Sequence, residues 1–243
     1  MTELDVLTCD VTGLNSDFLK EFKGRARADY LNHPALNILS YDFSTVVGSN
    51  VPSGVLANEI LREVGYRTVK LSDVERAIKE NRFDIPSSII NTGVVLTDEN
   101  GPRYYLADNL MRQLPKQDFP VMMPISSLKL RLNPESRYGL AFDLNEDPEF
   151  FYAPILKDWG HDDVSEYATV PREITGIGNF SSRDVDLESG LPTKLTQSTG
   201  ERLLVSCGTG LLGVSLMSDL SLHIGPDLDH SRPKSRIIVI KDE

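Results

Sequence analysis

Apolar residues near the start of the chain recur at the spacing of a helix. Four of them follow one another at four-residue intervals, beginning two residues after Ser16: Phe18, Phe22, Ala26 and Tyr30. Because a serine can cap a helix and such a stripe faces a core, the segment predicts an amphipathic helix. Its basic residues lie mostly off that stripe: Lys20, Lys23, Arg25 and Arg27. They predict a solvated face, with a phosphate-binding patch as the alternative.

Two more helices are expected before residue 83. The first runs from Gly54 to Val64, between the capping residue Ser53 and the terminating residue Gly65. The second runs from Ser72 to Arg82 and starts with the capping box Ser72-Asp73-Val74-Glu75. In such a box the serine oxygen and the glutamate carboxylate each accept a hydrogen bond from a free backbone amide.

Strand-like alternation takes over after Pro86. Residues 90–96 and 103–106 flank a turn and predict one hairpin, and residues 128–132 and 140–144 predict a second with one face in the core. A short helix from Asp108 to Leu114 is expected between them. The remaining predicted strands lie near the C-terminus: Arg202–Cys207, a long strand Leu212–Ile224, and Ile237–Ile240.

These elements predict an α+β fold, with a helical N-terminal half packed on antiparallel hairpins and a β-rich C-terminal third with long loops. The loops are expected between residues 157 and 199, where Gly, Ser, Asp and Pro are frequent and periodicity is weak. The periodicity changes between Pro115 and Pro124. This change divides the chain into a mixed helical region, 1–120, which contains a helix–helix–hairpin unit at 53–107, and a β-rich region, 121–243. A single domain is the alternative.

Composition narrows the classes of function. The chain has 243 residues, of which 40% are hydrophobic and 25% charged, as in ordinary folded proteins. Its 36 acidic and 25 basic side chains give a net charge of −11, which disfavours nucleic acid unless a local basic patch exists. No apolar run is long enough to span a bilayer, so no membrane partner is expected.

The cysteines and the N-terminal residues predict a cytoplasmic protein that is not secreted, or one assembled from a cytoplasmic pool. Cys9 and Cys207 are far apart in apolar surroundings, which favours free thiols over a disulfide framework. Glu3 and Asp5 occupy positions where an export signal would carry positive charge.

One motif resembles a dinucleotide fingerprint. Gly208–Gly213 has the form G-x-G-x-x-G, and Asp227 follows at a suitable distance. Such glycines bind pyrophosphate only when a helix follows, because the helix N-terminal amides hold the phosphate. Apolar residues after the motif instead alternate with polar ones, which predicts a strand. We therefore expect a glycine-rich turn and no bound cofactor.

Other candidate sites are fragments. The oxygen-rich segment 143–147 lacks the glycine and the final glutamate of a calcium loop, so it predicts a polar turn. Two groups of residues have the side-chain chemistry of divalent-metal ligands, but neither forms a complete coordination sphere: Asp227, Asp229 and His230, and His161 with Asp163. No serine elbow is present, and Cys207 has no base close to it in sequence. No catalytic residue and no metal ligand is assigned.

The predicted helices 54–64 and 72–82, followed by a hairpin that closes on Gly101–Leu106, resemble a winged helix-turn-helix over about 55 residues. The resemblance implies that four basic residues face phosphate or bases: Lys70, Arg76, Lys79 and Arg82. Acidic residues share the second helix and weaken the attraction to DNA. A winged helix used for protein contact, or an unrelated helix pair under a sheet, is therefore favoured.

The sequence predicts a non-enzymatic binding or assembly protein that contacts protein partners or itself. A subunit of a larger homomeric assembly, or a structural component of a virion, fits this prediction. Two alternatives stay open. One is a winged-helix regulator that binds nucleic acid, and the other is an enzyme whose site is assembled from scattered residues, around His161 or His230.

Overall fold

A computed structural model of the chain describes residues 15–36, 38–42, 45–47, 49–82, 88–97, 107–114, 119–136, 139–156, 174–208, 210–231 and 234–242. The described helices are α1 (Asn15–Ala28), α2 (Val51–Arg62), α3 (Leu71–Lys79) and α4 (Ala107–Gln113). The described strands are β1 (Leu39–Asp42), β2 (Thr45–Val47), β3 (Tyr66–Thr68), β4 (Ile89–Leu96), β5 (Val121–Pro124), β6 (Leu128–Leu132), β7 (Leu140–Leu144), β8 (Phe151–Tyr152), β9 (Ile174–Phe180), β10 (Arg202–Cys207), β11 (Leu211–Leu216), β12 (Leu222–Gly225), β13 (Ser235–Arg236) and β14 (Val239–Lys241). The predicted α+β class is confirmed.

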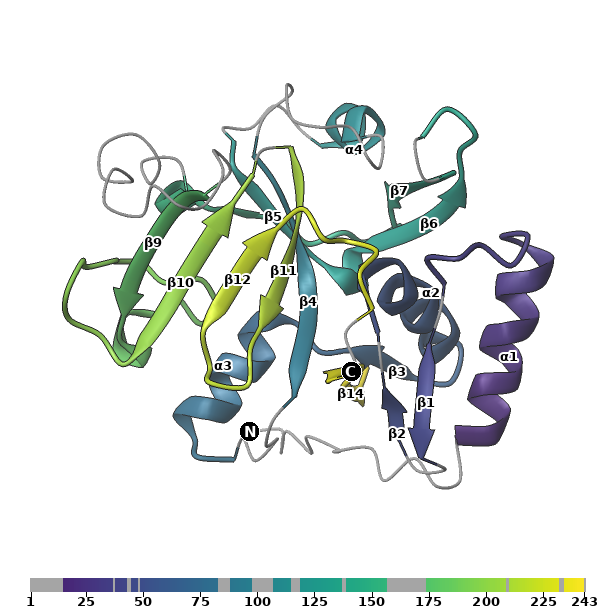
Figure 1. The fold of residues 1–243 in the computed structure, drawn as a ribbon, viewed down its shortest axis with the longest axis horizontal. Coiled ribbons are helices and arrows are strands. Elements are labelled where there is room, and N and C mark those ends of the chain that lie inside the picture. Colours follow the sequence, from purple (N-terminus) through teal and green to yellow (C-terminus); the bar gives the residue numbers. More distant parts are fainter. Residues whose placement is uncertain are drawn as a thin grey trace.

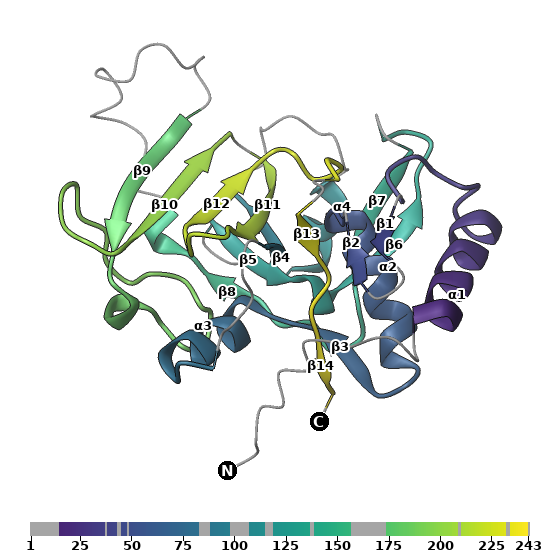
Figure 2. The same cartoon turned by 60° about the horizontal axis from the view of Figure 1, so that its bottom comes forward.

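One large sheet organises the described part of the chain. Ten strands join it, in the order β1-β2-β13-β4-β11-β12-β10-β9, with β5 beside β4 and β8 beside β5. Strands from both sides of residue 120 lie in this sheet. Helices α1 and α2 lie toward its β1 end, and α3 lies toward its β9 end (Figures 1 and 2). Within the described residues, no helix combines the length and the apolar character needed to cross a bilayer.

Strand β4 occupies the middle of the sheet, and strands pair along both of its edges. Gly93–Leu96 pairs with β5, while β11 pairs with β4 along the opposite edge. The hairpin expected between residues 90–96 and 103–106 is therefore wrong for β4, and residues 103–106 lie outside the described residues. The turn residues at 98–101 favour a hairpin through local preferences alone. A strand with two apolar faces buries more apolar surface when it lies at the centre of a sheet.

Alternate residues of the central strands supply two separate cores. Val94 and Leu96 of β4 belong to a cluster that includes residues of α1, α2 and the β6–β7 hairpin. Val95 belongs to a second cluster, which contains Leu71 and Val74 of α3. Because successive strand residues point to opposite faces, one strand can contribute to both cores.

The predicted β6–β7 hairpin is confirmed. Leu130 pairs with Phe142, and both are buried, whereas Lys129 is exposed. The turn between the strands is closed in part by Asn133, whose side-chain oxygen accepts a hydrogen bond from the Glu135 amide at 3.0 Å. Period-two alternation with a polar turn thus identified this element correctly.

Helices α1, α2 and α4 match the predicted segments closely, although the cap of α2 differs. Asn50, not Ser53, caps α2, because its side-chain oxygen accepts a hydrogen bond from the Ser53 amide at 2.8 Å. The Asn50 amide group also donates to the Ala35 carbonyl at 2.7 Å. One side chain therefore caps the helix and ties it to the segment that follows α1.

The predicted capping box of α3 is displaced by two residues, because Lys70 and Asp73 take the places expected for Ser72 and Glu75. The helix begins at Leu71, and the Lys70 amide donates to the carboxylate of Asp73 at 2.8 Å. Glu75 does not cap the helix, because its carboxylate receives two hydrogen bonds from the Arg202 guanidinium, each of 2.6 Å. Glu75, which the local motif assigned to the cap, thus forms a long-range ion pair instead.

This ion pair fixes α3 to the sheet. The side chains of Arg202 and Glu75 are only 2% and 1% exposed. Arg202 also donates to the Leu220 carbonyl at 2.8 Å, and its guanidinium lies 4.6 Å from the centre of the Phe180 ring. A buried charge without its partner is costly, so the two charged residues depend on each other.

The long strand expected from Leu212 to Ile224 is instead two antiparallel strands, β11 and β12. A tight turn joins them, in which the Met217 amide donates to the Ser221 carbonyl at 2.8 Å. Asp219 accepts hydrogen bonds from Ser221, and these bonds lower its carboxyl pKa. Apolar and polar residues continue to alternate through this turn, so the sequence pattern did not indicate it. Strand β9 lies within the segment expected to form loops, which is a second correction.

Gly93 should be intolerant of any side chain. A Cβ at this position would overlap the carbonyl oxygen of Met123 in the neighbouring strand. We expect Gly93→Ala to lower the free energy of unfolding by about 1–3 kcal/mol, as measured by urea denaturation. Gly24→Ala is the control, because a Cβ there meets nothing within 4 Å in an exposed helix. It should stabilise the protein by about 0.5–1 kcal/mol, and equal effects of the two substitutions would contradict the close strand approach.

Breaking the buried ion pair should destabilise the protein more than removing it entirely. We expect Glu75→Gln to lower the free energy of unfolding by about 3–5 kcal/mol, because it leaves the Arg202 charge buried without a counter-charge. The double variant Glu75→Leu with Arg202→Met should recover most of that loss. Thermal and urea denaturation of the three proteins measures both effects. A double variant less stable than Glu75→Gln would argue against this account.

Candidate functional site

The basic residues that the winged-helix resemblance selected are placed along α3 and at its ends. The ammonium group of Lys70 lies 2.6 Å from the Glu149 carboxylate. Arg76 is exposed and donates a hydrogen bond to the Leu187 carbonyl at 3.2 Å. Both side chains therefore have partners within the protein.

The other two members of that set lie at the C-terminal end of α3. Lys79 is exposed, and Arg82 lies 3.4 Å from the Glu80 carboxylate. Asp73 and Glu75 point into the protein, where each pairs with an arginine. The structure thus brings the four basic residues to one helix but joins three of them to groups of the chain itself.

The glycine-rich motif forms a turn before a strand, as its alternation predicted. Gly208 and Gly210 have φ values of +92° and +91°, a conformation that glycine adopts without steric cost. Gly213 lies inside β11, where a Cβ would come within 3.3 Å of Val51 and Leu228 side chains. The three glycines therefore serve a turn and the close packing of α2 on the sheet.

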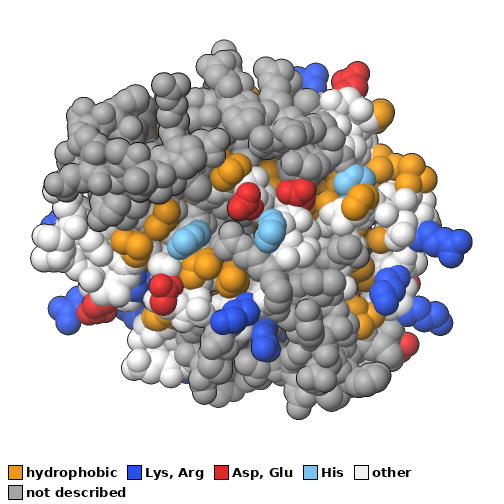
Figure 3. All heavy atoms as spheres, in the orientation of Figure 1, with side chains coloured by type: hydrophobic (Ala, Val, Ile, Leu, Met, Phe, Trp, Pro, Cys, Tyr) orange, Lys and Arg blue, Asp and Glu red, His pale blue; other side chains and the backbone are white. Residues whose placement is uncertain are grey.

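Candidate metal ligands do not assemble into a site in the part of the chain that the structure describes. No group of three or more His, Cys, Asp or Glu side chains is placed there to hold an ion, Asp227, Asp229 and His230 included. Asp143 pairs with Arg131 at 3.0 Å. His161 and Asp163 lie outside the described residues. Figure 3 shows histidine, acidic and basic side chains spread across one face, with several basic side chains at the side where α1 lies.

A hollow of about 380 Å³ lies beside α1. It is bounded by α1 and by the segment that leads to β1, and its lining combines apolar and basic side chains: Leu19, Phe22, Lys23, Ala26, Arg27, Asn32, Leu36 and Ile38. Phe22, Ala26 and Leu36 are buried and form its floor, whereas Lys23 and Arg27 are exposed at its rim. Its lining, as far as the described residues form it, contains no carboxylate.

The basic residues of α1 fall into two groups. Arg25 bonds to Glu21 at 2.8 Å and to Glu63, beyond the end of α2, at 2.5 Å. These hydrogen bonds raise the pKa of the Arg25 guanidinium. Lys23 and Arg27 form no ion pair with any residue that the structure describes. From the sequence these cations were expected to form one solvated face, whereas among the described residues Arg25 has ion-pair partners and Lys23 and Arg27 have none.

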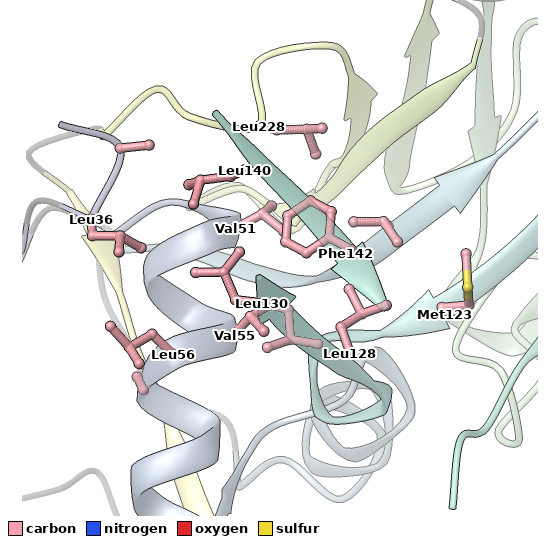
Figure 4. Close-up of a cluster of buried hydrophobic side chains, with 14 of the residues drawn as sticks. Leu36, Val51, Val55, Leu56, Met123, Leu128, Leu130, Leu140, Phe142 and Leu228 are labelled. Carbon is pink, nitrogen blue, oxygen red and sulfur yellow. The ribbon is translucent and has the colours of Figure 1, made fainter. Parts of the chain in front are cut away.

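Tyr30 and Glu59 hold the hairpin against the helices next to this hollow. The Tyr30 hydroxyl donates to the Leu130 carbonyl at 3.0 Å, and the Leu130 amide donates to a Glu59 carboxylate oxygen at 2.9 Å. Burial raises the pKa of both side chains. Figure 4 shows Leu130 close to Val55 of α2, in the core beneath these bonds. The floor of the hollow therefore rests on a fixed framework.

The turn after α1 adds an exposed apolar side chain next to the rim. Leu31 is 78% exposed, and Leu31 and Asn32 both have positive φ values, 55° and 56°. The Asn32 amide donates to the Ala26 carbonyl at 2.7 Å, and the Ala35 amide donates to His33 at 3.1 Å. These bonds hold a backbone conformation that residues other than glycine adopt infrequently.

Comparison with known proteins gave no match, either to a protein family, to a curated protein or to a solved structure.

The raised pKa of Glu59 predicts a pH effect on stability. Because the folded state binds the Glu59 proton more tightly than the unfolded state, stability should fall as pH rises from the ordinary carboxyl range through the raised pKa. Glu59→Gln keeps an oxygen that accepts the Leu130 hydrogen bond but removes the charge. Urea denaturation should be measured from about pH 4 to about pH 7, which covers the range in which carboxyl groups titrate. The free energy of unfolding of the variant should rise relative to that of the wild type as pH rises. A constant difference would contradict the assignment.

Proposed function

We propose that the protein is a non-enzymatic binding protein, and that the hollow beside α1 takes a short acidic and apolar segment of a partner protein. The observation that carries this proposal is the combination of Lys23 and Arg27, without ion-pair partners among the described residues, with a buried apolar floor. The chain as a whole carries a net charge of −11, so the two cations at the rim of the hollow contrast with its overall charge.

The apolar floor and the basic rim of the hollow contribute differently to recognition of the partner segment. Removing an apolar side chain of the partner from water at the floor supplies affinity, at about 25 cal/mol per Å² of buried apolar area. The basic rim attracts carboxylates and disfavours basic segments, which supplies specificity and speeds association. Acidic and apolar side chains together are therefore the complement of this surface.

The size of the hollow supports a segment as the occupant. A volume of about 380 Å³ is in the range of sites that bury small ligands, about 300–1,000 Å³. It accommodates a few side chains, and a folded domain would contact mainly the surface around it. The ordered turn at Leu31–Asn32 and the bond between Arg25 and Glu63 support a hollow that is formed before the partner binds.

A short peptide tests the proposal. Residues 2–7 of the chain read Thr-Glu-Leu-Asp-Val-Leu and alternate acidic with apolar side chains, so a labelled synthetic peptide of this sequence is the probe. We expect the double variant Lys23→Glu with Arg27→Glu to bind it at least about tenfold more weakly than the wild type, by fluorescence anisotropy, because two attractions become repulsions. Raising the salt concentration should weaken binding to the wild type.

Lys20→Glu and Leu19→Ser are the matched variants. Lys20 is exposed on the same helix but does not line the hollow, so its charge reversal should change peptide affinity less than about threefold. Leu19 lines the hollow, and its replacement should weaken binding without a change in charge. Equal affinity of the wild type and the double variant, or no binding at all, would exclude this function.

Assembly into a homomeric or viral particle stays a prediction. Light scattering of the purified protein, with and without the Lys23→Glu and Arg27→Glu changes, measures whether the partner is a second copy. A mass well above 27.1 kDa that falls in the double variant would identify self-association through the hollow.

A further inference from the structure

The hollow adjoins an edge of the large sheet with which no described strand pairs. Strand β1 is the last strand at one end of the sheet, and β2 is its sole partner among the described strands, through Leu39 with Val47 and Ser40 with Val46. Leu36 and Ile38, which line the hollow, immediately precede β1. Figure 1 shows α1 on the side of β1 that faces away from β2. The hollow therefore lies between α1 and the segment that leads directly into this edge strand.

The backbone N–H and C=O groups on the outer edge of β1 can bind another strand. Among the described residues, backbone bonds of Leu39–Asp42 run only to β2. An edge strand presents a row of free N–H and C=O groups, which form a template for another strand. Edge strands of this kind receive extended peptides in several unrelated recognition domains, where backbone bonds supply affinity and neighbouring pockets select side chains.

We propose that the partner segment binds in an extended conformation, as a strand added to the free edge of β1 alongside α1. This inference rests on the proposed function and specifies how the hollow recognises its segment. The added strand places its backbone about 4.8 Å from β1 and directs alternate side chains toward the hollow. Strand β1 has four residues and spans about 13 Å, which sets the length of the paired segment at four to six residues.

The geometry defines a sequence class for the partner. Because side chains at positions i and i+2 of a strand share a face, apolar residues at alternate positions enter the hollow above Phe22 and Leu36. The intervening residues stay at the rim, where Lys23 and Arg27 favour carboxylates. A helical partner would need apolar residues three and four positions apart instead, so the two modes predict different sequence patterns.

Backbone methylation of the probe peptide distinguishes these modes. In an added strand, only alternate residues direct their N–H groups toward the neighbouring strand, so an N-methyl group blocks pairing at those residues alone. Two peptides of the sequence Thr-Glu-Leu-Asp-Val-Leu are needed, one N-methylated at its second and fourth residues and the other at its third and fifth. We expect one of them to bind the wild-type protein at least about tenfold more weakly than the unmodified peptide, and the other to stay within about threefold.

The outcomes separate this inference from the proposed function. If the unmodified peptide binds in a manner that depends on Lys23 and Arg27 and both methylated peptides bind alike, the added strand is wrong and the hollow is still the binding site. If the unmodified peptide does not bind, the proposed function itself fails. Hydrogen exchange gives an independent measurement, because an added strand should slow exchange of amides within Leu39–Asp42, whereas a bound helix should leave them unchanged.

Discussion

Strand β4 must satisfy both of its hydrogen-bonding edges and both of its faces within the protein, and the other elements are arranged around that requirement. Strands β5 and β11 take its edges, and two hydrophobic clusters cover its faces. Gly93 lets β5 approach closely, because no Cβ stands between the two strands. Burying a backbone group without a partner costs about 2–7 kcal/mol in an apolar environment. The strands beside β4 must therefore pair with its backbone groups.

The candidate site follows from how the helices are attached to this centre. Helix α2 packs over the sheet, where Gly213 leaves room for Val51. Helix α1 is held to the end of α2 by Arg25 and Glu63, and to the β6–β7 hairpin by Tyr30. These attachments use one side of α1. The opposite side carries Lys23 and Arg27, and within the described part of the chain it borders the hollow together with the segment before β1.

The positive charges beside the hollow define the candidate site. Many of the cations in the described residues are matched by carboxylates, as Arg202 is by Glu75 and Lys70 is by Glu149. Of the basic residues that the winged-helix resemblance selected, Lys70 and Arg82 lie beside carboxylates, and Arg76 bonds to a backbone carbonyl. Lys23 and Arg27, beside the hollow, have no carboxylate partner among the described residues, and they lie near its apolar floor and the segment that leads into the edge strand β1. A short, acidic, extended segment satisfies all three features at once.

The sequence by itself determined the elements whose signals are local: the amphipathic helix α1, the pair α2 and α3, and the β6–β7 hairpin with its polar turn. It also determined that the glycine motif precedes a strand, because residue alternation is a property of neighbouring positions. Tertiary structure decided which strands flank β4, where the β11–β12 turn falls, and that Glu75 pairs with Arg202 instead of capping α3. It also decided that Arg25, among the cations of α1, pairs with Glu21 and Glu63. Each of these depends on contacts between residues far apart in the chain, whose energies exceed the local preferences that periodicity and capping motifs express.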